Sequence, residues 1–268
     1  MADATPPPLA AAPSEIISVA DVGSPAQPRY GIVAILDALG ASNYSKADAE
    51  QFLASRDRVI EATQTAVENS LKRFEVERLK RFTFNDTVVL AYLLDEIAPE
   101  SIRDIETFCH VLRAFETLSL KNGILFRGSL AVGELYRVSE HSGTIMGPAV
   151  SDAAAWYGLA DWIGIIATPH ATILIDSLLE QASGSLDHVL VGYEVPFKDG
   201  RRIVLKAVNW PKGFYVRGLA PLNVAATAKA QLLTLLSRHQ VPRGSESKYS
   251  NTIDFFNFIE SGQGLKTR

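Results

Sequence analysis

The sequence predicts an α+β sandwich in which helices pack on one side of a mostly antiparallel sheet. A continuous apolar and β-branched run at residues 30–36 is typical of a strand buried on both faces. Two further apolar runs flank Asn85-Asp86, a pair that suits a tight hairpin turn because both residues tolerate positive φ. Long helical patterns alternate with these strands, and the order β-α-β-β-α-β followed by α-β-α-β-β is typical of such a sandwich.

The individual elements follow from the spacing of apolar residues and from turn signals. Ser101 is a suitable N-cap for the second helix, and Asn122-Gly123 is suited to end it. Gly133 predicts a bulge or bend in the strand that comes next. In chain order we expect strand 30–36, helix 46–80, strands 81–84 and 87–94, helix 101–121, strand 124–138, helix 151–160, strand 162–168, helix 171–181, strands 189–195 and 202–208, and helices 225–238 and 249–260.

Three regions are expected along the chain. Residues 1–28 are rich in Ala and Pro, which predicts a disordered leader. Residues 29–222 contain all the predicted strands and should form the main domain. Residues 223–268 should form a C-terminal helical extension.

Composition narrows the class of protein. The chain has 268 residues and a formal net charge of −4, so it lacks the basic excess of a protein that coats nucleic acid. No stretch reaches the roughly 18 apolar residues of a membrane span and the N-terminus does not resemble a signal peptide, so we expect a cytoplasmic protein without a membrane partner. The single cysteine, Cys109, excludes an intramolecular disulfide. The five histidines are scattered, no two of them have metal-ligand spacing on one helix, and none is assigned a role.

Two aspartates are candidate metal ligands because each lies at the end of a predicted strand or in a predicted turn. Asp37 ends the first predicted strand, and Gly40 and Ser42 follow in a loop whose N–H groups can cradle phosphate oxygens. Asp86 lies in the predicted hairpin turn. Taken singly, the first aspartate could simply cap a helix and the second could simply form a turn. Together, on adjacent strands, their carboxylates can share two metal ions about 4 Å apart, which activate a hydroxyl and neutralise a leaving pyrophosphate.

A third charged residue, Arg127, lies within a predicted strand of small and apolar residues. A cation in that position needs an anionic partner, because burying an unpaired charge is unfavourable. A structural ion pair is one explanation. A clamp on a phosphate group is the more specific one, since the guanidinium matches phosphate geometry.

In order and spacing, these segments resemble the motifs of class III adenylate and guanylate cyclases. Segment 35–42 (ILDALGAS) is similar to the family's first-strand motif, 84–86 (FND) to its second metal-binding hairpin, and 126–134 to the strand with its phosphate-binding arginine. Segment 147–154 (GPAVSDAA) is similar to the stretch that leads into the helix bordering base and ribose, and 197–200 (FKDG) resembles the hairpin that supplies a lysine to the phosphates.

The resemblance implies a ferredoxin-like, or palm, sandwich that converts a nucleoside triphosphate to a 3′,5′-cyclic nucleotide and pyrophosphate. It also implies a homodimer whose two protomers meet head to tail and share composite active sites. By the same resemblance, Asp37, Asp86 and the backbone carbonyl of Ala38 hold two Mg²⁺ or Mn²⁺ ions, and Gly40, Ser42, Arg127 and Lys198 hold the triphosphate.

The base-reading positions depart from the family's pattern. Its two purine readers fall on Phe82 and Pro148, and its asparagine and transition-state arginine fall on Ser151 and Ala155. The chain therefore looks most similar to the bacterial Pycsar-type pyrimidine cyclases, which make cyclic UMP or cyclic CMP in anti-phage defence and activate a separate effector.

That resemblance favours UTP over CTP as substrate, with Tyr44 and Arg81 as candidate base contacts. A loop aromatic and a solvated strand-end charge are the plainer explanations of these two residues. Three alternatives stay open: a catalytically silent, nucleotide-binding sensor, a purine cyclase, and a related palm-type polymerase. The last lacks its Gly-Gly-Asp/Glu-Glu/Asp-Phe hairpin in this sequence.

Overall fold

The computed structural model describes residues 29–40, 45–70, 75–137, 144–182, 184–216, 219 and 227–262. The predicted leader at 1–28 lies outside these ranges, and so do the candidate site residues Ser42 and Tyr44. Within the described ranges, no helix combines the length and the apolar character that a membrane crossing requires.

An eight-stranded sheet forms the centre of the molecule. Its strand order is β2-β3-β1-β4-β6-β8-β7, with β5 paired to β4 outside this path. Each pairing is antiparallel except the parallel pair β4–β6. The strands are β1 (Arg29–Ala38), β2 (Leu79–Phe84), β3 (Thr87–Leu94), β4 (Phe126–Arg137), β5 (Ile145–Met146), β6 (Gly164–Ala167), β7 (Leu190–Pro196) and β8 (Arg202–Val208). The prediction of an α+β protein with a mostly antiparallel sheet is confirmed.

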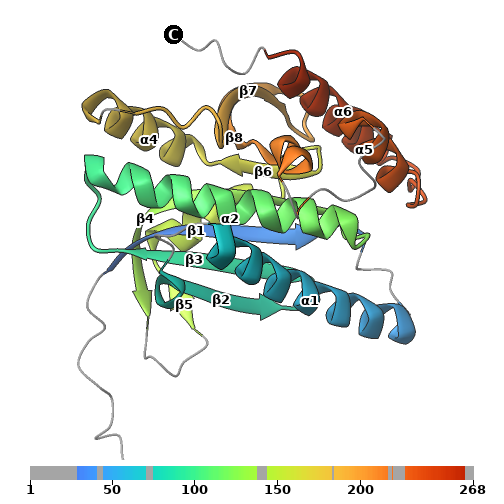
Figure 1. Cartoon of the computed structure of the whole chain (residues 1–268), viewed down its shortest axis with the longest axis horizontal. Helices are drawn as coiled ribbons and strands as arrows, with labels where there is room; N and C mark the ends of the chain where they lie inside the picture. Colours follow the sequence, from blue (N-terminus) through green and yellow to red (C-terminus); the bar gives the residue numbers. More distant parts are fainter. Residues whose placement is uncertain are drawn as a thin grey trace, which may run out of the picture.

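Helices cover both faces of this sheet, and α1 and α2 lie together across one of them (Figure 1). The helices are α1 (Lys46–Ser70), α2 (Ile102–Lys121), α3 (Pro148–Trp156), α4 (Pro169–Gln181), α5 (Ala228–Leu236) and α6 (Glu246–Glu260). The C-terminal helices α5 and α6 share an apolar cluster with β6, β7 and β8.

The expectation that helices lie on one side only is wrong. In β1, Ile32 and Leu36 join the core beneath α1 and α2, whereas Val33 and Ile35 pack with α3 on the opposite face. The physical reason is already present in the run at 30–36, because a strand that is apolar at successive positions must be covered on both faces.

Two predicted details also change. The helix expected over 46–80 ends at Ser70, and Leu79 already pairs with Tyr92 in the β2–β3 hairpin. Sheet pairing satisfies the backbone of this segment and overrides its helical spacing. Gly133 pairs directly with Gly31 in an unbroken register, so there is no bulge. A Cβ atom at Gly133 would already touch Ala149, so the glycine lets α3 approach β4 closely.

The acidic side chain of Glu116, on α2, is buried in the apolar core. Glu116 is fully buried, and neither carboxyl oxygen has a hydrogen-bond partner among the described residues. Burial raises the pKa of Glu116 well above its ordinary value. The folded state therefore holds this proton more tightly than the unfolded state, so stability is greatest below the ordinary pKa and falls as pH rises toward the raised one.

The Glu116→Gln variant is expected to be more stable than the parent chain at neutral and alkaline pH, because the amide has no proton to lose. Between the ordinary and the raised pKa of Glu116, the free energy of unfolding of the parent falls by at most about 1.4 kcal/mol per pH unit. Thermal unfolding at about pH 5 and about pH 8 measures this, and the advantage should be larger at the higher pH. The exposed Glu100→Gln change serves as control, and an advantage independent of pH would contradict the assignment.

Candidate functional site

The two aspartates singled out in the sequence lie on neighbouring strand ends. Asp37, near the end of β1, is paired with Thr87 of β3 on one side and with Arg127 of β4 on the other. The amide of Ala38 donates a hydrogen bond to the backbone carbonyl of Asp86, with 3.2 Å between nitrogen and oxygen. The amide and the carbonyl of one strand residue face the same neighbour, so the Ala38 carbonyl is also directed toward Asp86.

The turn that carries Asp86 is held from the helical side. Asn85 has a left-handed φ of 51°, which asparagine tolerates better than most residues. The buried guanidinium of Arg56, on α1, donates to the Asn85 carbonyl over 2.9 Å and is also paired with Asp57. Packing of α1 on the sheet thus fixes the position of the hairpin tip.

Arg127 forms an ion pair with Asp37. The Nη2 and Nε atoms of Arg127 lie 2.9 Å and 3.2 Å from Oδ2 of Asp37. Both side chains are mostly buried, with 15% and 16% exposed. The ion-pair explanation of Arg127 therefore holds in this state of the protein. The same guanidinium also lines a cavity, where it can meet a phosphate group.

That cavity has a volume of about 760 Å³ and lies between the ends of β1 and β4, the β7–β8 hairpin and the segment that joins α5 to α6. Its size is typical of a site for a small molecule. Among the described residues that line it, every charged one is basic. Gly40 contributes backbone to the lining, and the polar or aromatic lining side chains include Arg127, Lys198, His239, Lys248 and Tyr249.

The basic residues raise the positive potential of the cavity. Burial lowers the pKa of Lys198, and the nearby cations Arg127 and Lys248 lower it further, against smaller opposing contributions from Asp37 and Asp161. A lysine whose neighbours disfavour its charge gains most from a bound anion. The cavity is therefore suited to a polyanionic group.

Three lining residues from the C-terminal region were missed in the sequence. Lys248 is held near the cavity by Asp161, with 3.5 Å between Nζ and Oδ1. The Nε2 atom of His239 is buried without a hydrogen-bond partner among the described residues. Tyr249 follows Lys248 on α6. No local spacing relates these residues to the strand motifs, so only the packing of the C-terminal helices reveals them.

The structure places some of the other predicted contact residues in the cavity and one of them elsewhere. Gly40, with φ of 86°, and Lys198 both line the cavity. Arg81 is paired with Leu90, whose side chain lies in the core under α1 and α2, so Arg81 is on the face of the sheet opposite to Asp37. The structure does not bring Arg81 together with the other site residues.

The donor set near Asp37 fits hard divalent cations. Two carboxylates and a backbone carbonyl offer only oxygen, which Mg²⁺ and Mn²⁺ prefer. No described residue hydrogen-bonds the carboxylate of Asp86, whereas that of Asp37 is shared with Arg127. A metal ion would thus compete with the guanidinium for Asp37.

Fold and site together define an α+β protein with a basic cavity, in which the lining residue Arg127 is ion-paired with Asp37. No family model and no curated protein matches the chain.

Proposed function

We propose that the protein is a nucleotidyl cyclase that converts a nucleoside triphosphate to its 3′,5′-cyclic monophosphate and pyrophosphate. The observation that carries the proposal is the ion pair of Asp37 with Arg127, which lines a cavity together with Lys198 and Lys248. The backbone of Asp86 is hydrogen-bonded to the residue after Asp37. An acidic pair for metal ions and a basic cavity for a triphosphate are the two parts that phosphoryl transfer requires.

In this proposal, Asp37, Asp86 and the Ala38 carbonyl hold two Mg²⁺ or Mn²⁺ ions. When bound, the ions supply activation of the ribose 3′-hydroxyl and neutralisation of the leaving group. The basic residues of the cavity orient the triphosphate while the bond from the 3′ oxygen to the α-phosphorus forms and the bond from the α-phosphorus to the leaving oxygen breaks. The hydroxyl proton passes to water. Positioning and charge supply most of the acceleration.

Arg127 changes partner in this scheme. Without substrate it neutralises Asp37, as the ion pair at 2.9 Å indicates. With metal ions and triphosphate bound, the Asp37 carboxylate would hold an ion instead of the guanidinium, and Arg127 would be free to contact the phosphates. One side chain thus stabilises the empty site and the loaded site in different ways.

The finer assignments rest on the resemblance to Pycsar-type pyrimidine cyclases. We propose UTP, ahead of CTP, as substrate, a cytoplasmic location, and a cyclic nucleotide that activates a separate effector in anti-phage defence. We also propose a homodimer. Phe84 is 75% exposed and, through its pairing with Thr87, lies on the same face of the sheet as Asp37, where it offers an apolar contact to a second protomer.

The Lys248→Met variant is expected to raise the KM for the triphosphate about tenfold, because a charge-assisted contact is lost. It should also move the alkaline rise in KM to higher pH, since a cation that lowers the pKa of Lys198 is gone. Steady-state kinetics over pH measures both effects. The exposed Lys229→Met change on α5 is the control, and an unchanged KM would contradict a role for Lys248.

The experiment that tests the function is incubation of the full chain with each ribonucleoside triphosphate and Mn²⁺, followed by mass spectrometry of the products. Cyclic UMP, with cyclic CMP second, is the expected result. Mostly cyclic AMP or cyclic GMP would make the protein a purine cyclase, and linear or dimeric products would indicate a polymerase. No product from any of the four triphosphates would overturn the proposal.

A second candidate, a catalytically silent nucleotide-binding sensor, is favoured by one observation. The Asp37 carboxylate is occupied by Arg127, and Ser151 and Ala155 stand where the resembling family has its asparagine and transition-state arginine. Calorimetry that finds nucleotide binding, together with an assay that finds no pyrophosphate release, would establish this sensor in place of the enzyme.

A further inference from the structure

A second group of metal-ligand side chains lies where α2 meets the turn before β7, and α2 is on the face of the sheet opposite to Asp37. Glu106, His110 and His188 each offer one ligand atom, and these atoms all lie within 4.8 Å of one another. The Oε1 atom of Glu106 is 2.8 Å from Nε2 of His188 and 3.8 Å from Nε2 of His110.

We propose that Glu106, His110 and His188 form a binding site for one divalent transition-metal ion such as Zn²⁺, which ties α2 to the segment before β7. Donor atoms around a tetrahedral ion at about 2.1 Å are about 3.4 Å apart. Two of the three separations, 2.8 Å and 3.8 Å, are already close to this value, and all three ligand atoms lie within 4.8 Å of one another, so modest side-chain rotations complete the geometry.

The backbone holds the three ligands in place independently of any ion. Glu106 and His110 are one turn apart on α2 and so share a helix face. His188 lies in a turn where the Leu186 carbonyl accepts hydrogen bonds from the amides of residues 189 and 190. The carbonyl of His188 in turn accepts a hydrogen bond from Arg113 of α2 over 3.2 Å. The site therefore does not need to be assembled from flexible segments.

The chemistry of the donors selects the class of ion. Two imidazoles and one carboxylate suit Zn²⁺ and its neighbours in the transition series better than Mg²⁺ or Ca²⁺. The side chains of Glu106 and His188 are 37% and 50% exposed, and His110 lines the end of a cavity of about 540 Å³ between α1 and α2. Water or another ligand can therefore fill the remaining coordination positions.

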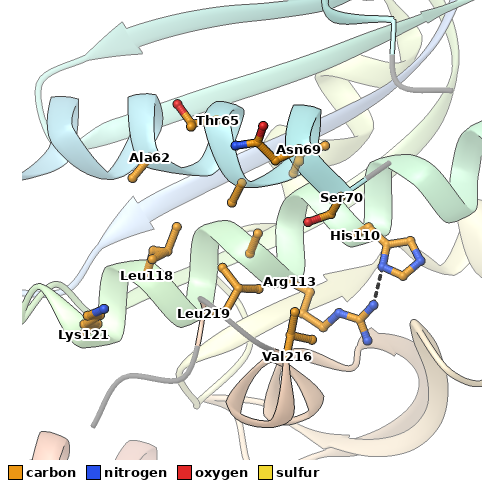
Figure 2. A pocket seen from close by; sticks show the side chains of 13 residues that line it. Ala62, Thr65, Asn69, Ser70, His110, Arg113, Leu118, Lys121, Val216 and Leu219 are labelled. Carbon is orange, nitrogen blue, oxygen red and sulfur yellow. Dashed lines mark hydrogen bonds between the residues drawn. The ribbon is translucent and has the colours of Figure 1, made fainter. Parts of the chain in front are cut away.

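Arg113 opposes the ion through its contact with His110, although it also donates a hydrogen bond to the carbonyl of His188. Figure 2 shows its guanidinium turned toward the ring of His110, where it contacts Nδ1. A guanidinium can only donate, so Nδ1 is the acceptor and Nε2 carries the proton. An ion can bind at Nε2 only when the ring proton is on Nδ1 instead. The Nδ1–H group then needs a hydrogen-bond acceptor opposite it, and a guanidinium is not an acceptor. The Arg113→Gln variant offers such an acceptor and removes a positive charge.

Calorimetric titration with zinc chloride alone, on the full chain without an affinity tag, tests the proposal. One equivalent of zinc should bind, with a rise in Tm. The His188→Gln and Glu106→Gln variants should lose this equivalent, and both changes fall on partly exposed side chains that the fold tolerates. The matched control, His170→Gln on α4, changes an exposed histidine outside the group and should bind as the parent does.

Two further variants complete the test. Arg113→Gln should bind zinc at least about tenfold more tightly, since a nearby like charge is gone, and Asp37→Asn should keep the equivalent that depends on His188, because the two sites are separate. Cobalt(II) should give the visible absorption of a tetrahedral complex, lost in His188→Gln. Absence of zinc binding by the parent, or equal binding by His188→Gln, would overturn the site.

Discussion

The Asp37→Asn variant is expected to lose cyclic nucleotide formation by at least about 10³-fold, equivalent to roughly 4 kcal/mol in the barrier. The amide is neutral, so it can neither hold a divalent cation well nor balance two ions beside a triphosphate. It still offers an oxygen to Arg127, and the fold should therefore persist. Product formation from the preferred triphosphate with Mn²⁺, followed over time, measures the loss.

A matched control comes from Asp176, which is also ion-paired, to Lys206 over 2.7 Å, but lies exposed on α4. Asp176→Asn should leave turnover unchanged. Asp86→Asn should behave like Asp37→Asn, because both carboxylates are assigned to the same ions. Normal turnover in the Asp37→Asn variant would refute the metal assignment and, with it, the proposed mechanism.

The Arg127→Ala variant is expected to show two opposite effects. Turnover should fall about 10²- to 10³-fold, because a preorganised cation no longer faces the phosphates. Binding of Mn²⁺ without nucleotide should become tighter, since Asp37 is released from the guanidinium that lies 2.9 Å away. Turnover assays and calorimetry with manganese chloride measure the two effects separately.

The opposite signs distinguish this scheme from a purely structural ion pair, whose loss would weaken both properties through disorder. Arg127→Lys should recover part of the turnover, because it restores the charge without the bidentate geometry. Arg201→Ala serves as control, since Arg201 is exposed and, among the described residues, its side chain pairs with Asp199 of the same hairpin. Weaker manganese binding by Arg127→Ala would contradict the exchange of partners.

Some residues of the candidate site can be predicted from local sequence patterns, whereas the position of others depends on how the strands pair. Asp37, Asp86 and Arg127 each stand at a strand end, in a turn or in a strand, where alternation and turn chemistry are visible in the sequence. The register then pairs Asp37 with Arg127 and with Thr87, the residue that follows Asp86. Arg81 was a base contact in the sequence prediction, but the same register places it on the other face. Strand pairing decides the face, and a single sequence does not show it.

The proposed metal site of Glu106, His110 and His188 shows the same limit. The spacing of the five histidines alone indicates no metal site, yet Glu106 and His110 have the spacing of one helical turn. The spacing of histidines and carboxylates together therefore indicates two of the three ligands. His188 follows 78 residues after His110 and reaches the group only through the packing of its turn on α2.

The amino-acid sequence predicts the α+β class, the strands that carry Asp37 and Arg127, and the hairpin that carries Asp86. These features depend on local periodicity and turn preference, which neighbouring residues in the chain define. The folded structure is needed to show that α3 covers the second face, that Arg127 pairs with Asp37, and that Lys248 reaches the basic cavity. Those contacts join segments remote in the chain, and their energies depend on burial and charge in the folded state.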